Sequence, residues 1–137
     1  MVKVIIHDPL FLAMRSAPAL PEDAQTAADL LDTLTANKET CVGMAANMIG
    51  VLKRIIVFDN DGGYMTMFNP EIIKCDKPYN TSEGCLSLIG EPHPVKRYNS
   101  IKVRWQNENF ETRIKTFTGR PAQIIQHEID HCNGVLI

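Results

Sequence analysis

The clearest chemical signal in the chain is an HExxH pattern near its C-terminal end, formed by His127, Glu128 and His131. On a helix, residues four apart share one face, so both imidazoles could bind the same cation. Glu128 stands beside them and could take a proton from water bound to that cation. The pattern therefore predicts a catalytic metal site on a helix. The alternative is a solvated helix face that carries two unrelated histidines.

A catalytic metal site needs a third protein ligand and an open coordination position. Only six residues follow His131, and none of them is His or Glu, so the ligand must lie upstream. The upstream candidates are the acids and the residues His7, His93, Cys41, Cys75 and Cys85. Cys85 is the best placed, because Gly84 before it lets the backbone approach closely. A thiolate beside a cation also has a lowered pKa, which favours the charged ligand.

The other cysteines are weaker candidates. Cys41 and Cys75 lie in apolar surroundings and are predicted to pack as small hydrophobic residues. Cys132 faces about 100° away from His131 around the helix and is a poor ligand. The chain has no CxxC pair and no secretion signal, so we expect reduced thiols and a cytoplasmic location.

Length and composition limit the possible classes of protein. With 137 residues, 45% of them hydrophobic, we expect one domain that spans residues 1–137. A net charge of −2 argues against nucleic acid as the main partner. Apolar runs stay well below the roughly 18 residues that span a bilayer, so no membrane partner is expected.

The predicted elements place the HExxH pattern on the last helix. Apolar spacing indicates helices at 22–37 and 121–134, and short β-like runs lie between them at 54–59, 64–69, 71–75, 100–105 and 111–117. Helix, strands and helix without a repeating βαβ order favour an α+β fold.

Three segments give the chain a resemblance to the peptide deformylase family. They are Gly43-Met44-Ala45-Ala46, EGCLS at 83–87 and QHEIDHCNG at 126–134, and they occur in the family's order. Shorter likenesses, HDP at 7–9, RIIV at 54–57, FNP at 68–70 and VKR at 95–97, extend the match over nearly the whole chain. The resemblance implies an α+β fold with antiparallel sheets around a central HExxH helix.

The resemblance also implies a reaction and a cofactor. It implies hydrolysis of the formyl group from N-formylmethionyl peptides, such as the N-termini of nascent chains. One divalent metal ion would be held by Cys85, His127 and His131. The ion is usually Fe²⁺ in this family, and this ligand set leaves Zn²⁺, Ni²⁺ and Co²⁺ open.

Further residue roles follow from the same resemblance. Glu128 would be the general base and then the acid, and the backbone N–H of Leu86 would donate to the developing oxyanion. Gly43 and Gly84 would border the substrate backbone. Arg97 matches a family arginine by position and is assigned to substrate binding.

The first motif departs from the family pattern. The family's glutamine falls on Met48, whose thioether cannot donate a hydrogen bond, and its first glycine falls on Cys41. Asn47 could replace the lost donor only if the loop shifts. Arg120 and Gln123 stand where many relatives place apolar residues, and we interpret them as part of a solvated helix face.

These departures leave several hypotheses. We favour an active deformylase that is slow because of Met48, since losing one oxyanion donor costs roughly 10²–10³-fold in rate. The main alternative is a catalytically impaired, metal-binding relative that binds peptides or acts on another substrate. A generic HExxH protease lacks its downstream ligand, and a structural zinc site would need four protein ligands where three are evident.

Overall fold

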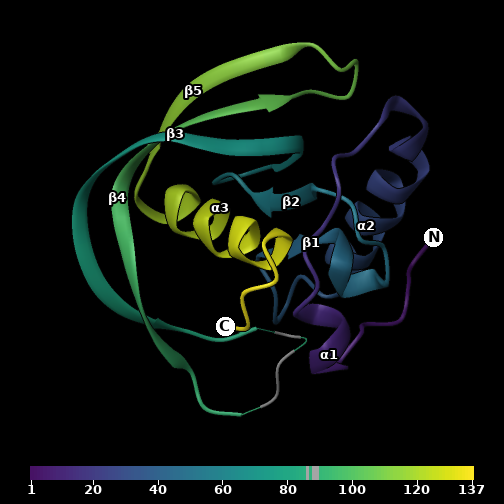
Figure 1. Cartoon of the computed structure of the whole chain (residues 1–137), viewed down its shortest axis with the longest axis horizontal. Helices are drawn as coiled ribbons and strands as arrows, with labels where there is room; N and C mark the ends of the chain where they lie inside the picture. The colour runs from purple at the N-terminus through teal and green to yellow at the C-terminus, as the bar shows by residue number, and fades with distance from the viewer. Residues whose placement is uncertain (86, 88–89) are drawn as a thin grey trace.

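The computed structural model describes residues 1–85, 87 and 90–137 (Figure 1). The α-helices of this part of the chain are α1 (Pro9–Leu12), α2 (Ala24–Ala36) and α3 (Gly119–Cys132), and its short 3₁₀ helices are η1 (Pro21–Asp23) and η2 (Ala46–Ile49). The strands are β1 (Gly43–Ala45), β2 (Ile55–Asp59), β3 (Tyr64–Glu83), β4 (His93–Gln106) and β5 (Thr112–Thr118). None of the helices in these ranges is both long enough and apolar enough to cross a membrane.

The strands form one antiparallel sheet in the order β1-β2-β3-β4-β5. Figure 1 shows this sheet curving around α3, which lies in the middle of the molecule. Helix α3 packs against β1, β2, β4 and β5, whereas α2 packs against β1 and β2. The predicted α+β fold with a central HExxH helix is therefore confirmed.

Strand β3 is longer than the sequence pattern indicates. It runs without a break where two strands were predicted, and the register shift between Phe68 and Glu71 marks a bulge at the expected boundary. Asn69 has a positive φ of 52° there, which a bulge accommodates. Beyond Ile72 the strand is mostly exposed, and Cys75 is exposed too, so its predicted apolar packing is wrong.

Strand β2 separates two apolar clusters. Ile56 and Phe58 belong to the cluster around α3, whereas Ile55 and Val57 belong to the cluster around α2. Because side chains alternate across a strand, a strand that is buried on both faces reads as an uninterrupted apolar run. The sequence Ile-Ile-Val-Phe meets that requirement and fixes β2 between the two helices.

The C-terminal end of α3 is closed by a glycine in the left-handed conformation. Gly134 has a φ of 75°, its N–H donates to the carbonyl of His131, and the N–H of Val135 donates to the carbonyl of Asp130. These two bonds form a Schellman motif, which satisfies carbonyls that the helix leaves unpaired. The turn ends the helix directly after the HExxH pattern, and Gly134 lies close to the backbone of Ala13.

We predict that Gly134→Ala destabilises the protein by about 2 kcal/mol, because an L-residue is strained at this φ. A Cβ at this position would also lie 2.8 Å from the carbonyl carbon of Ala13. Urea denaturation followed by circular dichroism would show a lower midpoint. Gly63→Ala is the matched control, since a Cβ there would meet no described atom within 4 Å. Equal midpoints for the two variants would contradict the proposed strain.

Candidate metal centre

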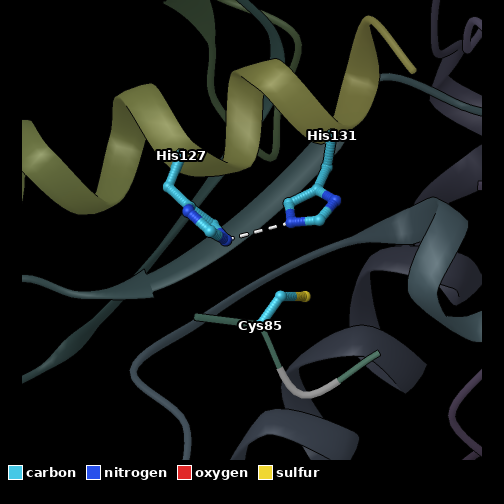
Figure 2. A group of neighbouring side chains, drawn as sticks. All are labelled: Cys85, His127 and His131. Carbon is cyan, nitrogen blue, oxygen red and sulfur yellow. Dashed lines mark hydrogen bonds between the residues drawn. The ribbon is translucent and has the colours of Figure 1, made fainter. Parts of the chain in front are cut away.

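Two imidazoles on consecutive turns of α3 point to the same place. The Nε2 atoms of His127 and His131 lie 3.0 Å apart, and the ring centroids are 4.7 Å apart. Figure 2 shows both rings extending from the helix toward the thiol of Cys85, which follows the end of β3. The ligand atoms of these three residues all lie within 4.8 Å of one another. The structure therefore brings together the three residues that the sequence suggests as metal ligands.

The protons on these rings are consistent with a cation site. The Nδ1 of His127 lies 2.8 Å from a carboxylate oxygen of Glu83, so this nitrogen carries the proton and Nε2 presents a lone pair. Burial lowers the pKa of His131, and the neighbouring His127 lowers it further, which keeps the ring neutral as a ligand must be. Burial opposes the charged form of His127, but hydrogen bonds to Cys85 and Glu83 raise its pKa. A bound cation would take the place of that additional proton.

The turn that carries Cys85 is tied to the rest of the molecule. The backbone N–H of Ser87 donates to the sulfur of Cys85 at 3.4 Å. The carbonyl of Ser87 accepts a hydrogen bond of 2.8 Å from Nδ1 of His7. The side chain of His7 therefore contacts the backbone of this turn. His93, another upstream candidate, lies at the start of β4, where it pairs with Glu83 across the sheet.

Glu83 organises the residues behind the ligands. Its buried carboxylate accepts hydrogen bonds from His127, Gln123 and Arg97, with the shortest from Arg97 at 2.6 Å. Burial alone would raise the pKa of Glu83, but these bonds outweigh it and lower the pKa to about 2. An ionised Glu83 holds the ring of His127 in one orientation.

Arg97 lies behind Glu83, away from the cavity lining. Its side chain is 7% exposed, and its guanidinium bonds Glu83 on one side and Asp130 on the other, at 2.7 Å. The cavity beside the metal ligands is lined by other residues. The structure therefore places Arg97 where it orients Glu83, and its predicted role in substrate binding stays a prediction.

Glu128 lies beside the ligands in a buried position. Its side chain lines the cavity, and its Oε1 has no hydrogen-bond partner among the described residues. Burial raises the pKa of this carboxyl group to about 7. A carboxylate with an unpaired buried oxygen and a pKa near neutrality is suited to taking up and releasing a proton.

The two predicted backbone glycines differ in their surroundings, although both line the cavity. A Cβ at Gly43 would lie 2.6 Å from Cγ2 of Ile124 and 2.9 Å from Oε2 of Glu128, so a side chain there would displace one or both of them. A Cβ at Gly84 would meet no described atom within 4 Å. Leu86, whose backbone N–H was predicted to bind the oxyanion, lies outside the described residues.

Met48, on which the family's glutamine falls in the sequence analysis, lies in η2. It is fully buried and lines the cavity, where its thioether offers no hydrogen bond. The side chain of Asn47 points elsewhere, because its Nδ2 donates to the carbonyl of His131 at 3.1 Å. Asn47 therefore does not replace the missing donor in this structure.

Gln123 and Arg120, which the sequence assigned to a solvated helix face, both line the cavity; Arg120 is exposed as expected, whereas Gln123 is half-buried. Gln123 donates to Glu83 at 2.9 Å, and Arg120 donates to Asp59 at 3.2 Å. Gln123 lies four residues and Arg120 seven residues before His127, which puts all three on the same face of α3. That spacing was the signal that could have identified them.

Cys41 and Cys132 are not part of the ligand cluster. The thiol of Cys41 donates to the carbonyl of Gly43 at 3.0 Å and packs against the cluster around α2, and burial raises its pKa to about 11. Cys132 is 1% exposed in the cluster around α3, and burial raises its pKa to about 12. Both thiols stay protonated, so neither competes with Cys85 for a cation.

Known proteins match the whole chain. The family described as polypeptide deformylase matches residues 4–137. A peptide deformylase of Clostridium beijerinckii is 50% identical over 137 residues, which cover all of both chains. Peptide deformylase 1 of Clostridium perfringens is 40% identical over 79% of this chain and 74% of its own.

Solved structures agree with the sequence relatives. A peptide deformylase of Thermotoga maritima superposes with a TM-score of 0.88 at 31% identity, covering 99% of this chain and 94% of the other. The class I type b enzyme of Acinetobacter baumannii, bound to Met-Ala-Ser, gives a TM-score of 0.88 at 28% identity, covering 99% and 96%. Sequence, fold and ligand cluster agree, and the chain belongs to the peptide deformylase family of metal-dependent hydrolases.

Proposed function

We propose that the chain removes the formyl group from N-formylmethionyl peptides, with one divalent cation held by Cys85, His127 and His131. The observation that supports this most directly is the convergence of these three ligand atoms beside the buried carboxylate of Glu128. The Met-Ala-Ser bound to the enzyme of Acinetobacter baumannii has the sequence of a deformylated product. Nascent chains are the natural source of such substrates, which places the reaction in the cytoplasm.

The donor set suits Fe²⁺ and also Zn²⁺, Ni²⁺ or Co²⁺, because one thiolate and two neutral imidazoles bind each of these ions. When bound, the cation supplies a Lewis acid that polarises the formyl carbonyl and acidifies water. We propose Fe²⁺ as the native ion, as in the family that the sequence resembles. Glu83 would keep the ring of His127 aimed at it.

Glu128 performs the proton transfers in this proposal. Its unpaired Oε1 accepts the proton of the attacking water as the oxygen–carbon bond to the formyl group forms. The same carboxyl group then delivers the proton to the amide nitrogen as the carbon–nitrogen bond breaks. Formate and a peptide with a free amino group leave. Gly43 gives the carboxylate room, since a Cβ there would contact Glu128.

The oxyanion that develops during attack needs hydrogen-bond donors. We propose the backbone N–H of Leu86 as one of them. Met48 offers none where the family has a glutamine, so a slow enzyme is expected. The same observation favours a second function, the binding of formylated peptides with little turnover.

We predict that Glu128→Gln lowers the rate of formyl-Met-Ala-Ser hydrolysis by at least about 10²-fold, because the amide cannot accept the proton of water. The measurement is formate release by protein prepared with Fe²⁺ under anaerobic conditions. Glu71→Gln is the matched control, since Glu71 is an exposed carboxylate that pairs with Arg104 on the sheet. Glu128→Gln protein with the wild-type rate would remove Glu128 from the mechanism.

We predict that Met48→Gln raises this rate by at least tenfold, because the new amide restores an oxyanion donor. Met48→Leu keeps an apolar side chain of similar volume and should leave the rate within about threefold. A silent wild type together with an active Met48→Gln variant would favour the catalytically impaired relative over the active deformylase. Equal rates in all three proteins would show that residue 48 does not face the oxyanion.

We predict that Cys85→Ser protein loses most of its metal during purification, because a hydroxyl is a much weaker ligand than a thiolate. The metal content is measured by inductively coupled plasma mass spectrometry. Cys41→Ser is the matched control, because Cys41 lines the same cavity outside the ligand cluster. Stoichiometric metal in Cys85→Ser protein would exclude Cys85 as a ligand.

A further inference from the structure

The cavity beside the ligands extends along one face of α3. Arg120, Gln123, Ile124 and His127 line it at the spacing of one helix face, so it follows the helix for roughly 10 Å from the metal ligands. Its volume is about 320 Å³, which is enough for one amino-acid side chain and the adjoining peptide unit. A peptide whose formyl group lies at the ligands would therefore place its first side chain near Gln123.

The orientation of the Gln123 amide is fixed by its neighbour. Its Nε2 lies 2.9 Å from Oε2 of Glu83, an oxygen that also accepts a hydrogen bond from Arg97. The NH₂ group therefore faces Glu83. The carbonyl oxygen Oε1, which accepts no hydrogen bond from the described residues, is the atom that remains for a ligand.

The wall that contains Gln123 is polar but carries no uncompensated charge. Thr40, Ser82 and Gln123 contribute hydroxyl and amide groups to the cavity, whereas Val42, Met48 and Ile124 contribute apolar surface. The guanidinium of Arg120 is paired with Asp59 and Asp61. The cavity is thus suited to a neutral, unbranched side chain with an apolar stem and a hydrogen-bond donor at its end.

We infer that Gln123 is a specificity-determining residue that lets this site take N-formyl peptides whose first residue is polar, with glutamine as the best fit, as well as formyl-Met. The inference rests on the proposed deformylase function. Glutamine and methionine have nearly the same length. A methionine side chain that displaces water from the cavity leaves Oε1 of Gln123 without a partner, whereas a glutamine amide can donate to that oxygen.

The test compares formyl-Gln-Ala-Ser with formyl-Met-Ala-Ser in wild-type and Gln123→Leu protein. We expect the ratio of the two kcat/KM values, Gln over Met, to fall about tenfold or more in the variant. Loss of the bond to Glu83 affects both substrates through His127, so the ratio separates specificity from damage to the metal centre. Gln123→Met is a second variant of closely matched shape, for which the same fall is expected.

A binding measurement supplies a readout that does not depend on turnover. In a Glu128→Gln background, calorimetry gives the Kd of each peptide, and the Kd ratio should change in the same direction when Gln123 is replaced. Glu71→Gln is the control, because Glu71 is an exposed carboxylate that pairs with Arg104 on the sheet and does not line this cavity, and its ratio should stay within about twofold of wild type.

The outcomes distinguish the two proposals. In one outcome, the wild type hydrolyses formyl-Met-Ala-Ser while Gln123→Leu and Gln123→Met leave the Gln-over-Met ratio of kcat/KM unchanged. This result would overturn the role of Gln123 and leave the deformylase function standing. A wild type that hydrolyses neither peptide, but whose Kd ratio depends on Gln123, would overturn the function and support the recognition. Absence of both hydrolysis and binding would overturn both.

Discussion

The structure depends on burying a helix that carries polar side chains. Helix α3 is enclosed by the sheet, and it brings His127, Glu128 and His131 into the interior with it. A buried polar group without a partner costs free energy, so such a helix is stable only where the surrounding chain supplies partners. Glu83, at the end of β3, supplies the most important one, because its carboxylate meets the Nδ1 of His127.

The buried negative charge of Glu83 also needs a positively charged partner. Arg97 from β4 neutralises it with three hydrogen bonds and also reaches Asp130 on α3, one residue before His131. The chain of contacts thus links two strands and the helix around one ligand. Figure 1 shows β3 and β4 curving around α3, and most residues of β3 beyond Ile72 are exposed. The contacts of Glu83 and Arg97 connect this otherwise exposed part of the sheet to the helix.

Much of the candidate metal centre could be predicted from the sequence, because its residues either lie close together in the chain or stand in a recognisable motif. The spacing of His127 and His131 needs only a helix, and Cys85 was identifiable from its EGCLS setting. Helices α2 and α3 and the apolar strand β2 also follow from the sequence pattern, whereas the four-residue helix α1 was not predicted. The three-residue strand β1 and the polar ends of β3 and β4 gave no such signal, because backbone pairing and not apolar alternation holds them in the sheet.

The role of Arg97 and the position of Gln123 depend on tertiary contacts. A buried arginine between two acids resembles a surface arginine when it is read in sequence, so its place behind Glu83 could not be foreseen. Gln123 carried a usable signal, since it lies four residues before His127, but its polarity suggested solvent. Polar residues are usually exposed, and that rule fails where a buried carboxylate needs another donor.

The parts of the site differ in how tightly the fold constrains them. The ligands and Glu83 form a closed network in which each change leaves a buried group unpaired, which is costly. Met48 and Arg120 line the cavity without contacting that network, so their side chains can change the oxyanion environment or the cavity mouth while the ligands stay in place. Gln123 belongs to both parts, because its Nε2 bonds Glu83 while its Oε1 is left for a ligand. A change at this one position therefore alters both recognition and the support of His127, and only measurements that compare two substrates on the same protein can separate these effects.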